Sequence, residues 1–162
     1  DHRAGLMPKV AQPPLVRETG YVHPVMGGGL GDNSHRAIAD AGGLTQFGKH
    51  LEVLHPGSRS SFRHWHTAQD EMVYMLSGEV VLIETTETLL VAGDAACWPA
   101  GSPVAHCLEN RSATDATDLI VGTRRSTDVI HYPDHDHITH KDGPARRYTH
   151  GDGRPRNSGE TP

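Results

Sequence analysis

Two histidines with one residue between them stand in the segment Phe62-Arg63-His64-Trp65-His66. Successive side chains of a β-strand point to opposite faces, so His64 and His66 point the same way if this segment is extended. Glu71 opens the next apolar run, and on the same face it adds a carboxylate to the two imidazoles. Neutral imidazole and carboxylate are ligands of divalent transition metals. The pattern therefore predicts a metal site.

A third histidine lies in the short run Val104-Ala105-His106-Cys107-Leu108, where His106 shares a face with Val104 and Leu108. Asp70 stands beside Glu71 but falls on the opposite face of a strict alternation. We therefore rank Asp70 as the second-choice carboxylate, or as a hydrogen-bond partner of one of the ligand imidazoles.

Short strands must position these side chains. From Phe47 onward, apolar-rich runs are separated by Gly, Pro, Asn and Asp, which is typical of an all-β sandwich or barrel. The 18 Gly and 11 Pro residues also indicate many turns. The runs predict strands at 47–54, 60–66, 71–76, 79–84, 88–91, 95–98, 104–109 and 117–123.

The two ends of the chain differ from this middle part. Residues 1–46 mix Pro and Gly with little periodicity and predict an irregular N-terminal arm, which leaves 47–130 for the barrel. Residues 131–162 are hydrophilic and predict an extended or disordered C-terminal tail. We interpret its His- and Asp-rich part, 131–140, as a solvated segment rather than a second metal site. Folding of this part across the barrel mouth is the alternative.

The charge balance excludes two classes of partner. Fifteen Lys and Arg against 20 Asp and Glu give a formal net charge of -5, so no broad basic field attracts nucleic acid or an anionic membrane. The chain has no uncharged apolar run long enough to span a bilayer, and its first residues lack the pattern of a secretory signal. We expect a soluble, cytoplasmic protein that acts on a small molecule.

Two segments resemble the paired motifs of the cupin superfamily. The first begins at Gly57, contains the His64 and His66 pair and Glu71, and ends at Gly78. One residue more than in the motif separates Gly57 from His64. Together with the second segment, this resemblance covers about a third of the chain.

The second segment runs from Gly93 through Pro99-Ala100-Gly101 and His106 to Asn110. Four residues rather than two separate Gly101 from His106. Both insertions fall between a turn and a strand, so they are expected to change loop shape and to leave the ligands in place.

The resemblance implies an antiparallel jelly-roll β-barrel, a homodimer, and a metal bound by His64, His66, Glu71 and His106. This ligand set accepts divalent Zn, Fe, Mn, Ni or Co. Four protein ligands leave two neighbouring positions of a six-coordinate ion for water, oxygen or substrate.

The residues around the metal depend on which face of 47–54 looks into the barrel. Either His50 and Glu52 or Lys49 contributes to the pocket. The resemblance favours a sugar-phosphate isomerase similar to the phosphomannose-isomerase branch, with Glu52 or His50 as the catalytic group that moves the proton. A non-haem iron dioxygenase or lyase and a non-catalytic small-molecule binding protein are the alternatives.

Overall fold

The computed structural model describes residues 9–156, and almost all of their regular structure is β-strand. The elements run in the order β1 (Val16–Glu18), β2 (Asn33–Arg36), α1 (Ile38–Ala41), β3 (Phe47–Leu54), β4 (Trp65–His66), β5 (Glu71–Ser77), β6 (Glu79–Ile83), β7 (Glu87–Val91), β8 (Ala95–Trp98), β9 (Cys107–Glu109), β10 (Ala116–Thr123), β11 (Thr127–Tyr132), β12 (His137–Asp142) and β13 (Ala145–Thr149), with a 3-10 turn at Pro133–His135.

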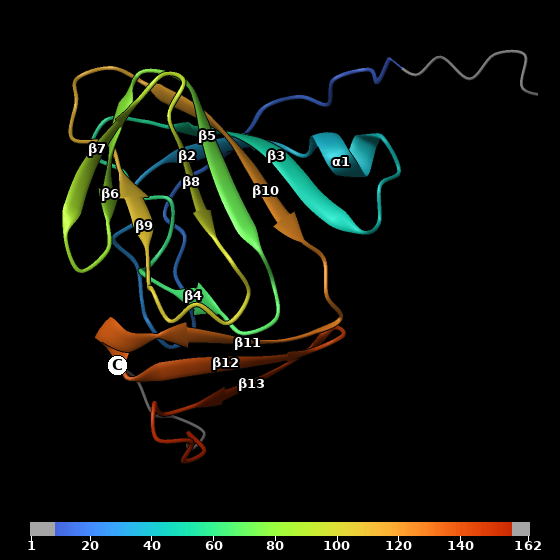
Figure 1. The fold of residues 1–162 in the computed structure, drawn as a ribbon, viewed down its shortest axis with the longest axis vertical. Coiled ribbons are helices and arrows are strands. Elements are labelled where there is room, and N and C mark those ends of the chain that lie inside the picture. Colours follow the sequence, from blue (N-terminus) through green and yellow to red (C-terminus); the bar gives the residue numbers. More distant parts are fainter. Residues whose placement is uncertain (1–8, 157–162) are drawn as a thin grey trace, which may run out of the picture.

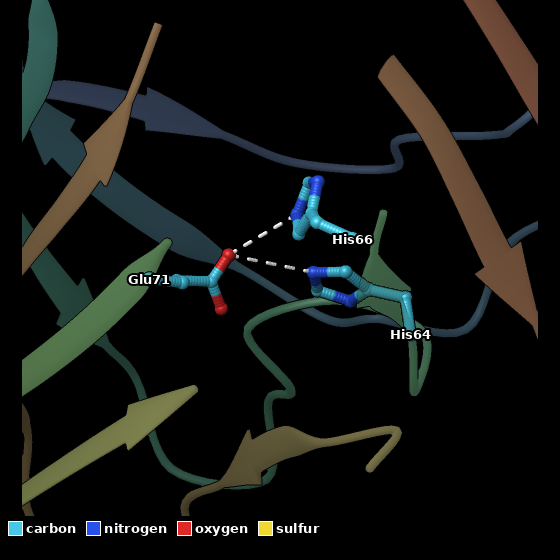
Figure 2. Close-up of side chains that lie close together, drawn as sticks. All are labelled: His64, His66 and Glu71. Carbon is cyan, nitrogen blue, oxygen red and sulfur yellow. Dashed lines mark ion pairs between the residues drawn. The ribbon is translucent and has the colours of Figure 1, made fainter. Parts of the chain in front are cut away.

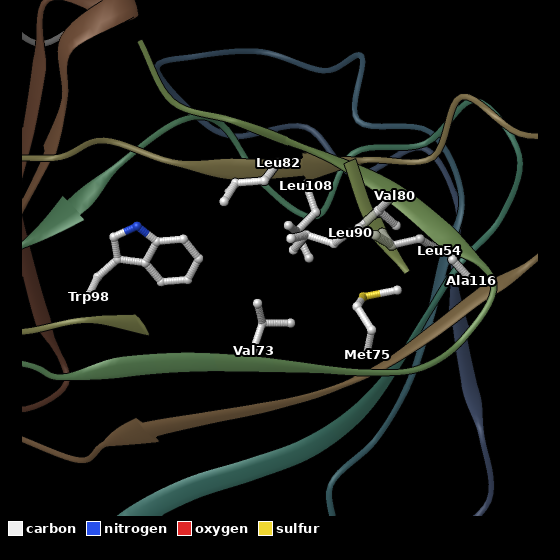
Figure 3. Packing of buried hydrophobic residues seen from close by; sticks show 9 residues of the cluster. All are labelled: Leu54, Val73, Met75, Val80, Leu82, Leu90, Trp98, Leu108 and Ala116. Atoms are coloured by element: carbon white, nitrogen blue, oxygen red, sulfur yellow. The ribbon is translucent and has the colours of Figure 1, made fainter. Parts of the chain in front are cut away.

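Two antiparallel sheets form the barrel (Figure 1). The larger has the strand order β1-β2-β3-β10-β5-β8, and the smaller has the order β7-β6-β9. Apolar side chains from the inner faces of the two sheets meet in one cluster, as Figure 3 shows. Its buried members are Leu54, Val73, Met75, Val80, Leu82, Leu90, Trp98, Leu108 and Ala116. The predicted all-β antiparallel barrel is therefore confirmed.

The register between β3 and β10 decides which face of β3 looks inward. Leu54 lies opposite Ala116, and both belong to the buried cluster. Alternation along the strand then brings Glu52 and His50 to the same inner face. Phe47, on the other face, is exposed. Of the two alternatives, His50 and Glu52 are the pair that contributes to the interior.

The strands expected at 60–66 and 104–109 are shorter than predicted, at Trp65–His66 and Cys107–Glu109. A side chain interrupts the pairing, because the N–H of Leu108 donates to the hydroxyl of Ser60 instead of a backbone carbonyl. Further along, His64 and His106 form an isolated antiparallel bridge. The two histidine segments therefore lie side by side without a continuous ladder.

The C-terminal segment is not an extended tail. In Figure 1, β11, β12 and β13 lie side by side across the end of the barrel, in a sheet of order β13-β12-β11-β4. The prediction is thus wrong over 137–149, and residues 157–162 lie outside the described part. The sequence did not predict these strands because the segment is polar. Its buried side chains include His and Thr residues that form hydrogen bonds with one another. His137, for example, is 1% exposed and contacts the Thr139 hydroxyl at 2.9 Å.

The Asp- and His-rich residues 134–137 form hydrogen bonds that fix the turn leading into β12. Asp134 forms two bonds with the Arg63 guanidinium, at 2.7 and 2.9 Å. Asp136 accepts the N–H of Gly151 at 2.8 Å. These contacts hold the 3-10 turn in place, so this part of the chain is not a freely solvated segment.

The expected N-terminal arm contributes β1, β2 and α1 among its described residues. β2 pairs with β3, with His35 opposite Glu52. No helix within residues 9–156 is long and apolar enough to cross a membrane.

Gly78, between β5 and β6, offers a test of the barrel. Its φ is +74°, and an added Cβ lies 2.6 Å from the carbonyl oxygen of Asp115. Gly78→Ala combines left-handed strain with overlap and is expected to lower the free energy of unfolding by about 3 kcal/mol in urea denaturation. Gly93→Ala is the matched control, because its φ is +91° but no atom lies within 4 Å of its Cβ. Equal losses of unfolding free energy in the two variants would contradict a close approach between residue 78 and the Asp115 carbonyl group.

Candidate metal centre

The four predicted ligands converge at one end of the barrel. Figure 2 shows the carboxylate of Glu71, on β5, pointing toward the rings of His64 and His66, which come from β4 and the residues just before it. Glu71 Oε2 lies 3.2 Å from His66 Nε2 and 3.7 Å from His64 Nε2. Its other oxygen, Oε1, lies 2.5 Å from His106 Nε2. The longer loop before His106 therefore still directs this ring to the site.

Each imidazole is oriented through its Nδ1 atom. His64 Nδ1 lies 2.8 Å from the carbonyl oxygen of Phe62, and His106 Nδ1 lies 3.0 Å from that of Val104. A carbonyl oxygen only accepts, so both Nδ1 atoms carry the hydrogen and donate it. In the neutral rings Nε2 then presents a lone pair toward Glu71.

This arrangement fits a divalent cation. A carboxylate oxygen and an unprotonated ring nitrogen that face each other at 2.5 Å, as those of Glu71 and His106 do, repel unless a proton or a metal ion lies between them. The ligand atoms of His64, His66 and Glu71 all lie within 4.8 Å of one another. Three imidazoles and one carboxylate match the donor preferences of the metals that the sequence analysis predicted.

A residue that the sequence analysis missed holds the third imidazole. Asp128, at the start of β11, is 2% exposed, and its Oδ2 accepts the Nδ1–H of His66 at 2.7 Å. Its other oxygen accepts the N–H of Ala68 at 2.8 Å. Asp70, the expected second-choice carboxylate, is exposed and accepts the N–H of Ala100 instead. No local signal pointed to Asp128, because only the pairing of β11 with β4 brings it to His66.

Comparison with known proteins identifies the family of the chain. The family model described as Cupin domain matches residues 50–122. A crystal structure from Silicibacter pomeroyi, of a protein named as a sugar phosphate isomerase from a cupin superfamily, is 39% identical with a TM-score of 0.81. The match covers 89% of this chain and 93% of that chain. The chain belongs to the cupin superfamily.

Two further solved structures are similar to this cupin. One, from Acidithiobacillus ferrooxidans, is provisionally named a sugar phosphate isomerase and is 25% identical, with 82% of this chain and 84% of that chain covered and a TM-score of 0.76. The other, named a predicted oxalate decarboxylase from Thermotoga maritima, is 24% identical, covers 68% of this chain and 92% of its own, and has a TM-score of 0.55. This last likeness shows the fold alone. Comparison with curated proteins gives no match.

The charges of the cupin's ligand groups favour a cation. Burial acts to raise the pKa of Glu71, but hydrogen bonds with His106, His64 and His66 outweigh it and hold the pKa well below the usual range. Burial acts to lower the pKa of His66, but its bonds with Asp128 and Glu71 raise it to about 9. Glu71 is therefore ionised, and a bound divalent ion would displace the proton that His66 otherwise holds.

A cavity of about 210 Å³ opens beside these ligands. Its lining includes His64, Glu71 and His106 together with His50 and Glu52. Trp98 forms one wall and stacks on the His106 ring, with centroids 3.6 Å apart and planes within 6°.

A second cavity, of about 200 Å³, shares Ser60 and Ser61 with the first. Tyr21, His23 and Tyr132 are among its other lining residues. The lining of neither cavity includes a described Lys or Arg. The two cavities therefore offer hydroxyl, imidazole and carboxyl groups but no fixed cationic side chain.

The role of Asp128 can be tested by measuring metal affinity. Asp128→Asn removes the anionic partner of His66 and is expected to weaken binding of Zn²⁺ or Mn²⁺ about 10- to 100-fold in competition with a chelating dye. Asp70→Asn makes the same chemical change outside the site and should leave the affinity within about twofold. A loss of affinity in Asp70→Asn alone would contradict this assignment.

Proposed function

We propose that this cupin is a metal-dependent isomerase that interconverts the aldose and ketose forms of a small sugar phosphate. One observation carries the proposal: the cavity that holds the metal-ligating side chains also holds the buried carboxyl group of Glu52. Oε1 of Glu52 has no hydrogen-bond partner in the described part of the chain. A metal site and a separate proton acceptor in one small cavity are the two elements that such a reaction needs.

The reaction moves two protons and needs no oxidant. His64, His66, Glu71 and His106 would hold a divalent ion, which would supply electrostatic stabilisation of the negative charge that develops on the substrate oxygens. Glu52 takes the proton from the hydroxyl-bearing carbon, and the electron pair of that C–H bond forms the double bond of an enediolate. Glu52 then returns the proton to the neighbouring carbon.

His50 is suited to move the second proton, from the hydroxyl oxygen to the former carbonyl oxygen. Burial lowers the pKa of His50, and the nearby ring of His35, whose centroid is 6.5 Å away, lowers it further. His50 is therefore neutral at pH 7 and has one nitrogen that donates and one that accepts. Its position in the cavity lining supports this role.

The neighbour from Silicibacter pomeroyi, named as a sugar phosphate isomerase, supports the substrate class. The cavities supply no Lys or Arg for a phosphate group, and the nearby guanidinium groups of Arg59 and Arg63 are paired with Glu109 and Asp134. We therefore propose that the sugar carbons enter the cavity while the phosphate stays at its mouth.

The homodimer and the cytoplasmic location stay predictions. The outer face of the larger sheet carries the exposed side chains of Phe47, Tyr74 and Leu76. We propose that a second copy packs against this sheet.

The metal requirement is tested with the variant His64→Ala/His106→Ala. Wild-type protein purified without chelator should contain about one equivalent of metal and interconvert aldose and ketose phosphates, and the double variant should lose both properties, because two of four ligands are gone. Unchanged metal content in the double variant would contradict the site. Iron with oxygen uptake in place of isomerisation would favour the dioxygenase, and tight ligand retention without turnover would favour the binding protein.

The proton acceptor is tested with Glu52→Gln, which keeps the size of the side chain. We expect kcat to fall at least about 100-fold and the exchange of substrate hydrogen with deuterated solvent to stop, while metal content stays unchanged. Glu79→Gln, at an exposed position on β6, is the control. Full activity of Glu52→Gln would exclude Glu52 from the proton transfer.

A further inference from the structure

A second buried carboxyl group lies directly opposite Glu52. Asp118 on β10 is the register partner of Glu52 on β3, and both side chains point to the inner face of the barrel. Asp118 is 0% exposed and Glu52 is 7% exposed. They lie deeper than the metal ligands, next to the apolar cluster that includes Met75.

Most of the carboxyl oxygens of Glu52 and Asp118 have no hydrogen-bond partner elsewhere in the described part of the chain. Oε1 of Glu52 and both oxygens of Asp118 are buried and have no hydrogen-bond partner among residues 9–156. Opposite positions on paired strands bring the two side chains within reach of each other, and a hydrogen bond between two carboxyl groups requires a proton on one of them. Two adjacent carboxylates without a proton would be two uncompensated negative charges in the protein interior.

No Lys or Arg stands opposite the pair on the neighbouring strands. His35 on β2 faces Glu52 across the sheet, and His50 lies two residues away on β3. Burial lowers the pKa of His50, so it is neutral at pH 7. On β5, the carboxylate of Glu71 adds a further negative charge that raises the pKa of Glu52.

We propose that Glu52 and Asp118 share one proton and accept the substrate proton as a pair. This inference rests on the proposed function for the identity of the substrate. Glu52, which lines the cavity, is the catalytic residue that contacts the substrate carbon. Asp118, which lies behind it, is a positioning residue: when it holds the shared proton, Glu52 is free to accept the proton of the substrate.

The shared proton makes the pair a better base than an exposed glutamate. Before the reaction the pair holds one proton and a charge of -1. The C–H bond of the substrate breaks, its proton forms an O–H bond on Glu52, and the pair becomes neutral while the electron pair stays on the substrate. Burial penalises charge, so it favours the neutral pair and thereby favours proton uptake. The return step leaves the pair with one proton again.

Burial raises the pKa of both carboxyl groups above their ordinary values, and the charge of Asp118 raises the pKa of Glu52 further. The hydrogen bond with Glu52 acts in the opposite direction on Asp118, but burial outweighs it. The pKa of the pair is therefore closer to neutral pH than the pKa of a solvent-exposed carboxyl group. A general base is most effective when its pKa lies near the working pH.

The proton itself can be detected by infrared spectroscopy of the metal-loaded protein at pH 7. Wild-type protein should show the C=O absorption of a buried, protonated carboxyl group, and Glu52→Gln/Asp118→Asn should lack it. This measurement on wild-type protein depends neither on a variant that folds nor on a known substrate. Absence of the wild-type absorption would overturn the proposal.

The role in catalysis is tested with Asp118→Asn. The Asn amide donates to Glu52 at every pH and stabilises its ionised form, so the pKa of Glu52 falls and it becomes a weaker base. We expect kcat to fall about 100-fold with KM little changed, and the acid-side limb of the pH profile to move to lower pH by about one unit or more. Asp115→Asn, an exposed carboxyl group just before β10, is the matched control and should change neither quantity.

These outcomes separate the pair from the proposed function. An active wild-type isomerase whose pH profile is unmoved in Asp118→Asn would overturn the pair and leave the function standing. A wild-type protein with the carboxyl absorption but no isomerase activity would overturn the function and leave the shared proton standing.

Discussion

Glu71 Oε1 and His106 Nε2 lie 2.5 Å apart. A carboxylate oxygen and an unprotonated imidazole nitrogen cannot stay this close without a positive charge between them. The surrounding contacts maintain this approach. Backbone carbonyl groups orient the rings of His64 and His106, and Asp128 orients that of His66. The C-terminal sheet supplies Asp128, so the strands that cross the end of the barrel both cover the candidate metal centre and orient one of its imidazoles.

The interior of the barrel changes character along its strands. On β3 the inward residues pass from His50 through Glu52 to Leu54, and on β5 from Glu71 to Val73 and Met75. One end of the interior is therefore polar and open to a cavity, while the other is the apolar cluster that stabilises the fold. Glu52 and Asp118 lie at the boundary between them, where the cost of burying charge is high and a shared proton lowers it.

Much of the site could be predicted from the sequence because its signals are local. The alternation of His64 and His66, the position of Glu71 and the turn glycines all lie within short segments, and their geometry follows from strand structure. The C-terminal strands could not be predicted in this way. Their buried residues, such as His137 and Thr139, are polar, and their burial depends on hydrogen bonds that the sequence does not display.

The sequence by itself indicated the all-β fold, a set of candidate metal ligands and two candidates for proton transfer, because these depend on residue type, on spacing within one strand or turn, and on the resemblance to the cupin motifs. The tertiary structure alone decided that β3 turns His50 and Glu52 inward, that Asp128 rather than Asp70 supports a ligand, and that Asp118 meets Glu52. Each of these results depends on which strands pair and in what register. Strand pairing joins residues far apart in the chain through backbone hydrogen bonds. These bonds are the same whatever the side chains are, so the residue types alone do not show which strands pair.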